Sequence, residues 1–372
     1  MKLHAVSGLW STGPVAAPPP LLAVLEVSGA VLSWTVDDPA GASATQITFT
    51  DAARADWLWQ MVGEPGHIAL VSALTGRDAH DGATVDLDGV DSSAAAVVPL
   101  RRLALGHWLR RWWPASERDA IAALDPAVLD GEVALLTAAA EDYFTDDTLD
   151  SEVAALLAPH GAALTSLLAA PDERVARLAR ACAQMAADTG VPGWPDGPAT
   201  TGDPIRRRDD YALAAGPDPS RDPVVAVATG AASIRWAAVA PGVFDAAEDT
   251  VAWEVLPAGG HAVARVRVAV TGAPSAAGVA VRLRCGAVAG TGALDAAGRA
   301  TVGLVDGSGE PLTESGAWNQ NWAGTDLAVG ADAAPAETPQ MRERVRMFAR
   351  TRLRRPARDA FLAELLAAES DY

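Results

Sequence analysis

The segment that most constrains the fold of this chain is a stretch rich in proline and glycine at residues 190–223. It contains seven prolines and five glycines. Proline fixes the φ angle and lacks an amide hydrogen, and the residue before it is pushed out of the α region. Neither a helix nor a central strand passes through such a stretch. We therefore predict a linker over residues 190–222, with a helix-rich part before it and a strand-rich part after it.

The part before this linker divides by pattern into a mixed α/β region at residues 1–96 and a helical region at residues 97–189, which together can form one domain. Two runs rich in β-branched residues flank Ser28 and Gly29, a pattern typical of a β-hairpin. Further strands are expected at 46–50, 68–74 and 84–87, and a helix at 52–62. In the second region, apolar residues at helical spacing predict helices over 99–113, 116–124, 127–143, 149–158, 160–170 and 172–188.

Residues 223–331 have the alternation of strands with one buried and one solvated face. The clearest case is AVARVRVAV at residues 262–270, where valine and arginine alternate. About seven short strands separated by turns favour an immunoglobulin-like β-sandwich, although the cysteine pair of antibody domains is absent. The expected fold class is multidomain α+β. The remaining strands are expected at 234–239, 251–256, 279–285, 300–305 and 326–329.

Residues 332–372 read as a short linker followed by a basic amphipathic helical tail. Two helices are expected, at 341–354 and 357–369, with a break at Pro356. The first carries a cluster of arginines in a chain of net charge −18, a local charge reversal that favours docking onto an acidic partner. The alternative is that the arginines pair with the chain's own acidic residues, for example between 141 and 152. The predicted partner-binding residues are Arg342, Arg346, Phe348, Arg350, Arg354 and Arg355.

Composition limits the classes of function. A net charge of −18 argues against general binding to nucleic acid, because the phosphate backbone repels an acidic surface. Two cysteines, at 182 and 285, make a poor disulfide framework and favour a cytoplasmic protein. No apolar run reaches the length of a transmembrane helix. Lys2 is the only lysine, and this preference for arginine suggests a GC-rich bacterial genome.

Three other groups of residues are candidate sites. Residues 101–113 mix tryptophan with arginine, which indicates either a core helix or a membrane-interface helix. Asp78, His80 and Asp81 could ligate a metal, although their spacing matches no known ligand set. Two tryptophans flank the chain's only asparagines and could bind a carbohydrate, or else fill the end of a sandwich. This last group is Trp318, Asn319, Asn321 and Trp322.

No nucleotide-binding loop, zinc-protease motif, paired C-x-x-C or nucleophile elbow occurs, and no cofactor is expected. We therefore predict a non-catalytic adaptor or accessory subunit of a bacterial multiprotein system. It would bind an acidic protein partner through the β-sandwich and the arginine-rich tail. The alternative is an enzyme or small-ligand binder, for metal or carbohydrate, whose site has no recognisable motif. A weaker alternative is a peripheral membrane protein. The sequence leaves the oligomeric state open.

Overall fold

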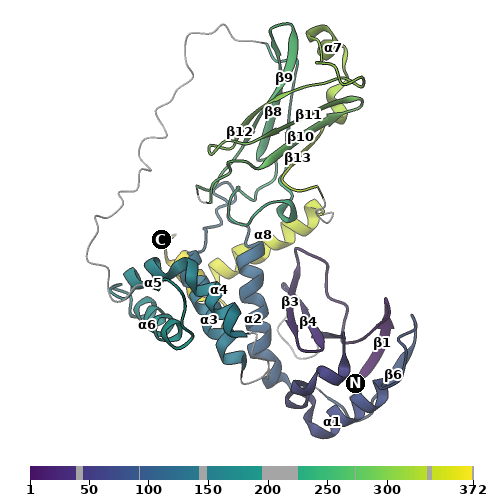
Figure 1. Cartoon of the computed structure of the whole chain (residues 1–372), viewed down its shortest axis with the longest axis vertical. Helices are drawn as coiled ribbons and strands as arrows, with labels where there is room; N and C mark the ends of the chain where they lie inside the picture. The colour runs from purple at the N-terminus through teal and green to yellow at the C-terminus, as the bar shows by residue number, and fades with distance from the viewer. Residues whose placement is uncertain are drawn as a thin grey trace. The chain divides into compact units, whose positions relative to one another are not determined.

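The computed structural model describes residues 1–38, 45–91, 93–141, 149–194, 225–272, 274–332 and 337–370 (Figure 1). Residues 195–222 of the predicted linker lie outside these ranges. The chain is α+β, with helices and antiparallel sheets. Its contacts define two compact units. Unit 1 comprises Met1–Trp113, Leu124–Ala199 and Gln340–Tyr372, and unit 2 comprises Pro114–Ala123 and Thr200–Pro339.

Unit 1 thus joins both regions before the linker and also takes in the C-terminal tail. This grouping differs from the five segments expected from composition, because the tail contacts residues that lie far before it in sequence. The five-segment division stays a prediction.

An antiparallel sheet in the order β3-β4-β5-β2-β1-β6 forms one part of unit 1. Alternate side chains on its strands are buried, among them Leu3, Leu32 and Ile47. The expected hairpin is confirmed, because β3 and β4 pair on either side of Ser28 and Gly29. The strands are β1 (Lys2–Val6), β2 (Leu9–Thr12), β3 (Leu22–Val27), β4 (Ala30–Thr35), β5 (Gln46–Phe49) and β6 (Thr84–Asp86).

The strand expected at 68–74 is wrong, because these residues belong to helix α1 (Trp59–Leu74). A short apolar run fits a buried helix segment as well as a strand. The helix expected at 52–62 ends next to a real irregularity: Gly63 has φ 74° and ψ 161°, so helix α1 changes direction there. Glycine adopts this backbone without steric cost.

The helical part of unit 1 begins with α2 (Ala94–Trp112), whose Trp108 indole donates a hydrogen bond of 2.7 Å to the carbonyl of Pro20. This contact fixes α2 beside the start of β3. The apolar stripe predicted on the last of these helices is confirmed, since Val175, Leu178 and Cys182 are buried. The other helices are α3 (Pro126–Glu141), α4 (Leu149–Leu157), α5 (Gly161–Leu167) and α6 (Glu173–Asp188).

The tail forms α8 (Pro339–Arg354) and α9 (Leu362–Ser370), and the predicted break at Pro356 is confirmed. Helix α8 lies beside α2 (Figure 1), where the rings of Trp108 and Phe348 meet edge-on with centroids 5.5 Å apart. Phe361, just before α9, is fully buried. The tail is therefore part of the core of unit 1.

The helix expected at 116–124 is wrong. Ser116 and Ile121 exchange two backbone hydrogen bonds, of 2.9 and 2.8 Å, and form an antiparallel bridge around a turn. Asp245 accepts a hydrogen bond from the amide of Glu117 at 3.0 Å, which attaches this turn to unit 2. A turn held by distant residues leaves no local signal in the sequence.

Unit 2 contains two antiparallel sheets, in the orders β12-β9-β8-β7 and β11-β10-β13. Their edges meet where Ala289 and Val305 exchange two backbone hydrogen bonds. The strand expected at 234–239 is wrong, because Trp236–Ala238 is a 3-10 turn, and β11 was not expected because it is rich in glycine. The strands are β7 (Ala228–Ala232), β8 (Val251–Ala258), β9 (His261–Val268), β10 (Ala280–Cys285), β11 (Val288–Ala293), β12 (Arg299–Gly303) and β13 (Asp326–Val329).

The strand order of unit 2 differs from that of an immunoglobulin domain. There, the first, second, fifth and fourth strands share one sheet, whereas here the first, second, third and sixth do. Antiparallel sheets with alternating burial are shown, and an immunoglobulin-like sandwich is not confirmed. Within the described residues, no helix combines the length and apolarity needed to span a membrane.

Candidate functional site

A cavity of about 440 Å³ in unit 1 brings together residues from three distant parts of the chain. It lies among the residues after β4, the first half of α2, helix α8 and the turn that follows α8. We call it the arginine pocket, because four arginines line it together with three aspartates and six apolar or small side chains. The lining residues are Val36, Asp37, Asp38, Val97, Val98, Arg101, Arg102, Leu105, Phe348, Arg352, Ala357, Arg358 and Asp359.

Helical spacing explains why apolar and cationic side chains share these walls. On α2, residues 97, 101 and 105 follow one another at intervals of four and therefore lie on one face. On α8, residues 348 and 352 have the same spacing. An arginine within an apolar stripe can bury its methylene groups and present its guanidinium group to a cavity.

Arg352 is the arginine of the pocket whose positive charge is best balanced by nearby carboxylates. Its Nη2 atom lies 2.7 Å from Glu364 Oε2, and its Nη1 atom lies 3.0 Å from Asp359 Oδ1. Burial lowers the pKa of Arg352, but hydrogen bonds from its guanidinium to Glu364 and the charges of both carboxylates raise it by more. The side chain is 6% exposed, and that of Glu364 is 0% exposed. Arg352 is therefore a permanently charged part of the pocket wall.

Arg102 pairs with Glu132, and its guanidinium carbon lies 5.1 Å from the centre of the Phe361 ring. Glu132 also accepts a hydrogen bond of 2.7 Å from the amide of Leu362, the first residue of α9. Burial raises the pKa of Glu132 above its ordinary value, although both partners oppose the shift. The Arg102 Nε atom is buried and has no hydrogen-bond partner among the described residues. The hydrogen-bonding capacity of the Arg102 guanidinium is thus only partly used.

Arg101 is the largely buried arginine of the pocket whose charge is least balanced, because no carboxylate lies within hydrogen-bond distance of it. Its side chain is 14% exposed, and the nearest carboxylate oxygen, Asp359 Oδ2, lies 3.6 Å from Nη1. Its Nη2 atom donates a hydrogen bond of 3.1 Å to the carbonyl of Asp38. Burial is the largest influence on the pKa of Arg101 and lowers it. A guanidinium group has five donors, so Arg101 retains capacity to bind an anion.

The charges around the pocket are nearly balanced. Asp37 is held by Arg344 through two contacts of 2.9 and 3.0 Å, so it is already neutralised. Arg358 is exposed and forms no ion pair with a described residue. The cationic capacity that remains is therefore on Arg101 and Arg358.

Two of the five predicted partner-binding arginines, Arg346 and Arg350, form ion pairs within α8. Arg346 is buried, and it and Arg350 bind Glu343 at 2.9 and 2.8 Å. Burial raises the pKa of Glu343, but these two arginines lower it by more. Arg342 is buried as well, Phe348 lines the arginine pocket, and Arg354 and Arg355 are exposed. Of the acidic residues considered as partners, 142–148 lie outside the described residues.

The candidate metal ligands lie in the turn between α1 and β6. The backbone of His80 closes this turn through hydrogen bonds with Asp78 and Ala83. In the described ranges, no group of three or more histidine, cysteine, aspartate or glutamate side chains, Asp81 included, is arranged to hold a metal ion.

The residues of the candidate carbohydrate site differ in exposure, so they do not all present their side chains to solvent. Trp322 is buried and donates a hydrogen bond of 3.0 Å to the carbonyl of Ala317. Asn321 caps the following 3-10 turn through the amide of Ala323. Trp318 is 51% exposed, and Asn319 is exposed at the end of helix α7 (Glu314–Asn319). Trp318, Asn319 and Asn321 are therefore exposed, whereas Trp322 is buried.

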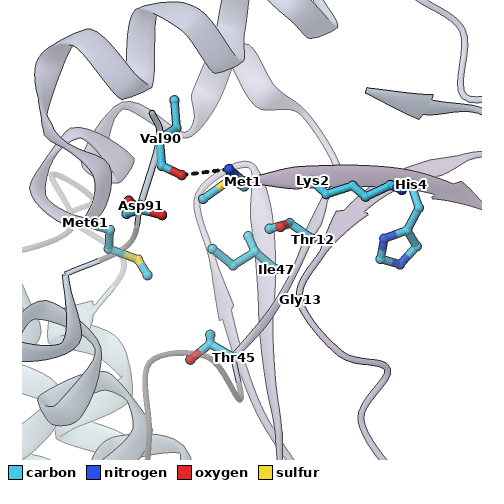
Figure 2. Close-up of a pocket in the computed structure, with 10 residues that line it drawn as sticks. All are labelled: Met1, Lys2, His4, Thr12, Gly13, Thr45, Ile47, Met61, Val90 and Asp91. Atoms are coloured by element: carbon cyan, nitrogen blue, oxygen red, sulfur yellow. Dashed lines mark hydrogen bonds between the residues drawn. The ribbon is translucent and has the colours of Figure 1, made fainter. Parts of the chain in front are cut away.

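A second cavity, of about 400 Å³, lies over one end of the unit 1 sheet (Figure 2). The side chains of Ile47 and Met61 line it, and the amino group of Met1 donates a hydrogen bond of 2.8 Å to the carbonyl of Val90 at its rim. The His4 ring lies at the opposite end of the cavity from Asp91 (Figure 2). His4 and Asp91 therefore do not form an acid–base pair across this cavity.

Sequence reasoning missed a polar cluster where α2, α3 and α4 meet. Asp130 accepts a hydrogen bond of 2.7 Å from Arg110 Nε and lies 3.0 Å from His160 Nε2. His107 Nε2 lies 3.6 Å from a carboxylate oxygen of Glu152. Among the described residues, no hydroxyl or thiol hydrogen-bonds to either histidine. The helical spacing of His107 and Arg110 is the only sequence signal of the cluster.

Comparison with protein-family models, curated proteins and solved structures finds no match to this chain. The geometry of the arginine pocket is therefore the basis for a proposed function.

Proposed function

We propose that this protein is a non-catalytic adaptor or accessory subunit and that unit 1 binds an acidic segment of a protein partner at the arginine pocket. The observation that carries this proposal is the state of Arg101. This cation is mostly buried, lines a cavity, and meets its nearest carboxylate only at 3.6 Å. A guanidinium group that is buried without a close carboxylate is stabilised when a carboxylate hydrogen-bonds to it directly.

The walls of the pocket favour an acidic segment that also carries apolar side chains. Val97, Leu105 and Phe348 line the cavity beside the arginines. A peptide with an acidic residue next to an aliphatic or aromatic one matches both parts of this lining. The predicted role of the tail in partner binding is retained in this proposal through Phe348, Arg352 and Arg358, whereas exposed Arg354 and Arg355 would add contacts outside the cavity.

We propose that unit 2 is a second module that recognises protein partners. We propose that its two sheets pack as a β-sandwich, which the buried Val266 of β9 and Leu283 of β10 support. We also propose a cytoplasmic setting in a bacterial cell, because both cysteines are buried free thiols and arginine replaces lysine almost throughout.

A second candidate function is the binding of a small carboxylate ligand. The volume of the arginine pocket, about 440 Å³, falls in the range of cavities that hold small molecules. In both candidate functions a carboxylate binds to Arg101, and the two differ in the size of the ligand that carries it.

Capture of the partner by the full-length chain tests the proposal. Wild type, R101Q and R180Q are compared, because Arg180 is an exposed arginine of unit 1 that pairs with Glu173 outside the pocket. We expect wild type and R180Q to recover the same protein and R101Q to lose it. We also expect binding to fail when acidic residues of that protein are neutralised. Equal recovery by all three variants would contradict the proposal.

The tail is not a suitable target for truncation in this experiment. Removal of residues 340–372 would take Phe361 and Glu364 out of the interior of unit 1. Loss of a partner after truncation would then report unfolding as well as loss of contact, so single substitutions in the pocket give the clearer result.

A further inference from the structure

We propose that Asp359 is a built-in competitor of the arginine pocket, occupying the position of the partner's carboxylate until the partner displaces it. This inference rests on the proposed function of the same pocket. Asp359 lies in the turn between α8 and α9 and bridges two arginines from different helices. Its Oδ1 atom is 3.0 Å from Arg352 and its Oδ2 atom is 3.6 Å from Arg101.

The contacts of Asp359 are those of a replaceable group. Its side chain is 27% exposed, so solvent reaches the carboxylate and screens both ion pairs. The contact to Arg101 is longer than a hydrogen bond between a guanidinium and a carboxylate. Asp359 is therefore held less tightly than Glu364, which is fully buried on the other side of Arg352.

Arg352 stays compensated when Asp359 leaves. Glu364 faces Arg352 with both carboxylate oxygens, through the Nε and Nη2 atoms of the guanidinium. Displacement of Asp359 thus leaves no buried cation without a partner at this position. The arriving carboxylate takes the place beside Arg101 and restores its compensation at hydrogen-bond distance.

The surroundings of Asp359 define the chemistry of the occupant. An acidic residue placed at Arg101 brings the next side chain of its segment against Val97, Leu105 and Phe348, which line the same cavity. Val98 is 62% exposed at the rim and extends the apolar surface outward. The occupant is therefore an acidic peptide segment with aliphatic or aromatic neighbours.

The test uses a short fluorescein-labelled peptide of alternating aspartate and leucine, titrated into the full-length chain and followed by fluorescence anisotropy. A second peptide has asparagine at each aspartate position. Salt near 0.15 M limits the long-range repulsion between the peptide and a chain of net charge −18, because the screening length is then about 8 Å. Wild type is compared with D359N and with the R101Q/D359N double variant.

The control is E173Q, which removes one negative charge from the surface of unit 1 on helix α6. We expect D359N to bind the acidic peptide about two- to fivefold more tightly than wild type, as loss of a weak competing ion pair allows. E173Q should bind as wild type does, and the double variant should lose the gain. Thermal unfolding of each variant verifies that the pocket is intact.

The outcomes separate the two proposals. Binding by wild type that D359N leaves equal or weakens would overturn the role of Asp359 and leave the proposed function standing. Failure of both wild type and D359N to bind, or equal binding of the asparagine peptide, would overturn both. A gain that E173Q reproduces would assign the effect to net charge and would also overturn the role of Asp359.

Discussion

Arg352 and Glu364, twelve residues apart in the tail, form an ion pair in the interior of unit 1, with Nη2 and Oε2 2.7 Å apart. Glu364 also accepts a hydrogen bond of 2.8 Å from the amide of Phe361, which fixes the turn between α8 and α9. The same pair thus closes the tail onto itself and forms one wall of the arginine pocket. A buried pair of this kind is costly to break, because the remaining buried charge loses its closest partner.

The first prediction concerns this pair. We expect R352M to lower the free energy of unfolding by about 3–5 kcal/mol, because it leaves the buried Glu364 carboxylate without its cation. E364Q should lower it by less, because Arg352 keeps its ion pair with Asp359 at 3.0 Å. The double variant R352M/E364L should recover part of the loss in R352M, since no buried charge remains. Urea denaturation of the full chain gives the energies, and hydrogen exchange of α2 assigns the transition to unit 1. A double variant less stable than both single variants would contradict this account of the pair.

The second prediction concerns the close packing of α2, α3 and the tail at Gly106. A Cβ atom added there would lie 2.6 Å from Val133 Cγ2 and 3.0 Å from Phe361 Cζ. We expect G106A to destabilise the protein by about 1–3 kcal/mol through overpacking, although alanine is the better helix former.

A double-variant cycle with V133A checks the cause of that loss. V133A removes the methyl group that the new Cβ meets, so the two changes together should cost less than the sum of the single costs. Additive costs would place the strain elsewhere.

The third prediction concerns pH. Burial lowers the pKa of His107, and the charge of Glu152 opposes this shift only in part. The unfolded chain therefore binds a proton at this histidine at higher pH than the folded chain does. We expect stability to fall as the pH drops below about 6.5, the ordinary pKa of histidine, and to level off below the folded pKa.

The H107Q variant should remove this component of the pH dependence. Denaturation midpoints of wild type and H107Q between pH 7.5 and 5 provide the measurement. Parallel pH profiles of the two proteins would show that His107 does not titrate differently in the folded and unfolded states.

The fourth prediction concerns Cys182 of α6. Burial raises the pKa of this thiol to about 12, and the charge of Glu132 adds to the shift. Because the thiolate is the reactive form, we expect alkylation of Cys182 at pH 8 to be slow in the folded protein and rapid in denaturant. Peptide mapping distinguishes it from Cys285. Rapid modification of Cys182 under native conditions would contradict the burial of α6 against α3.

Local patterns in the sequence predicted most elements of the fold. The hairpin of β3 and β4 was predictable because Ser28 and Gly29 separate two β-branched runs. The alternation at residues 262–270 predicted β9, and the helical spacing of Val175 and Cys182 predicted α6. The run at 68–74 was wrongly predicted as a strand, because six apolar residues in seven fit either a strand or a helix.

The arginine pocket was not predictable from these patterns. Its residues come from segments near positions 37, 101 and 355, and only long-range packing brings them together. The sequence did single out both the tail and the tryptophan–arginine helix, which meet at Trp108 and Phe348. The missing information was that Arg346 and Arg350 of α8 are occupied by the nearby carboxylate of Glu343, which leaves Arg101 and the exposed Arg358 as the pocket cations with spare capacity.

The most direct test of the central claim is the affinity of the aspartate–leucine peptide for wild type and for R101Q, measured by isothermal titration calorimetry with R180Q as the control. We expect R101Q to bind about tenfold or more weakly, as follows from loss of a charged hydrogen bond, and R180Q to bind as wild type does. Equal affinities of wild type and R101Q would contradict the claim that Arg101 receives the partner's carboxylate.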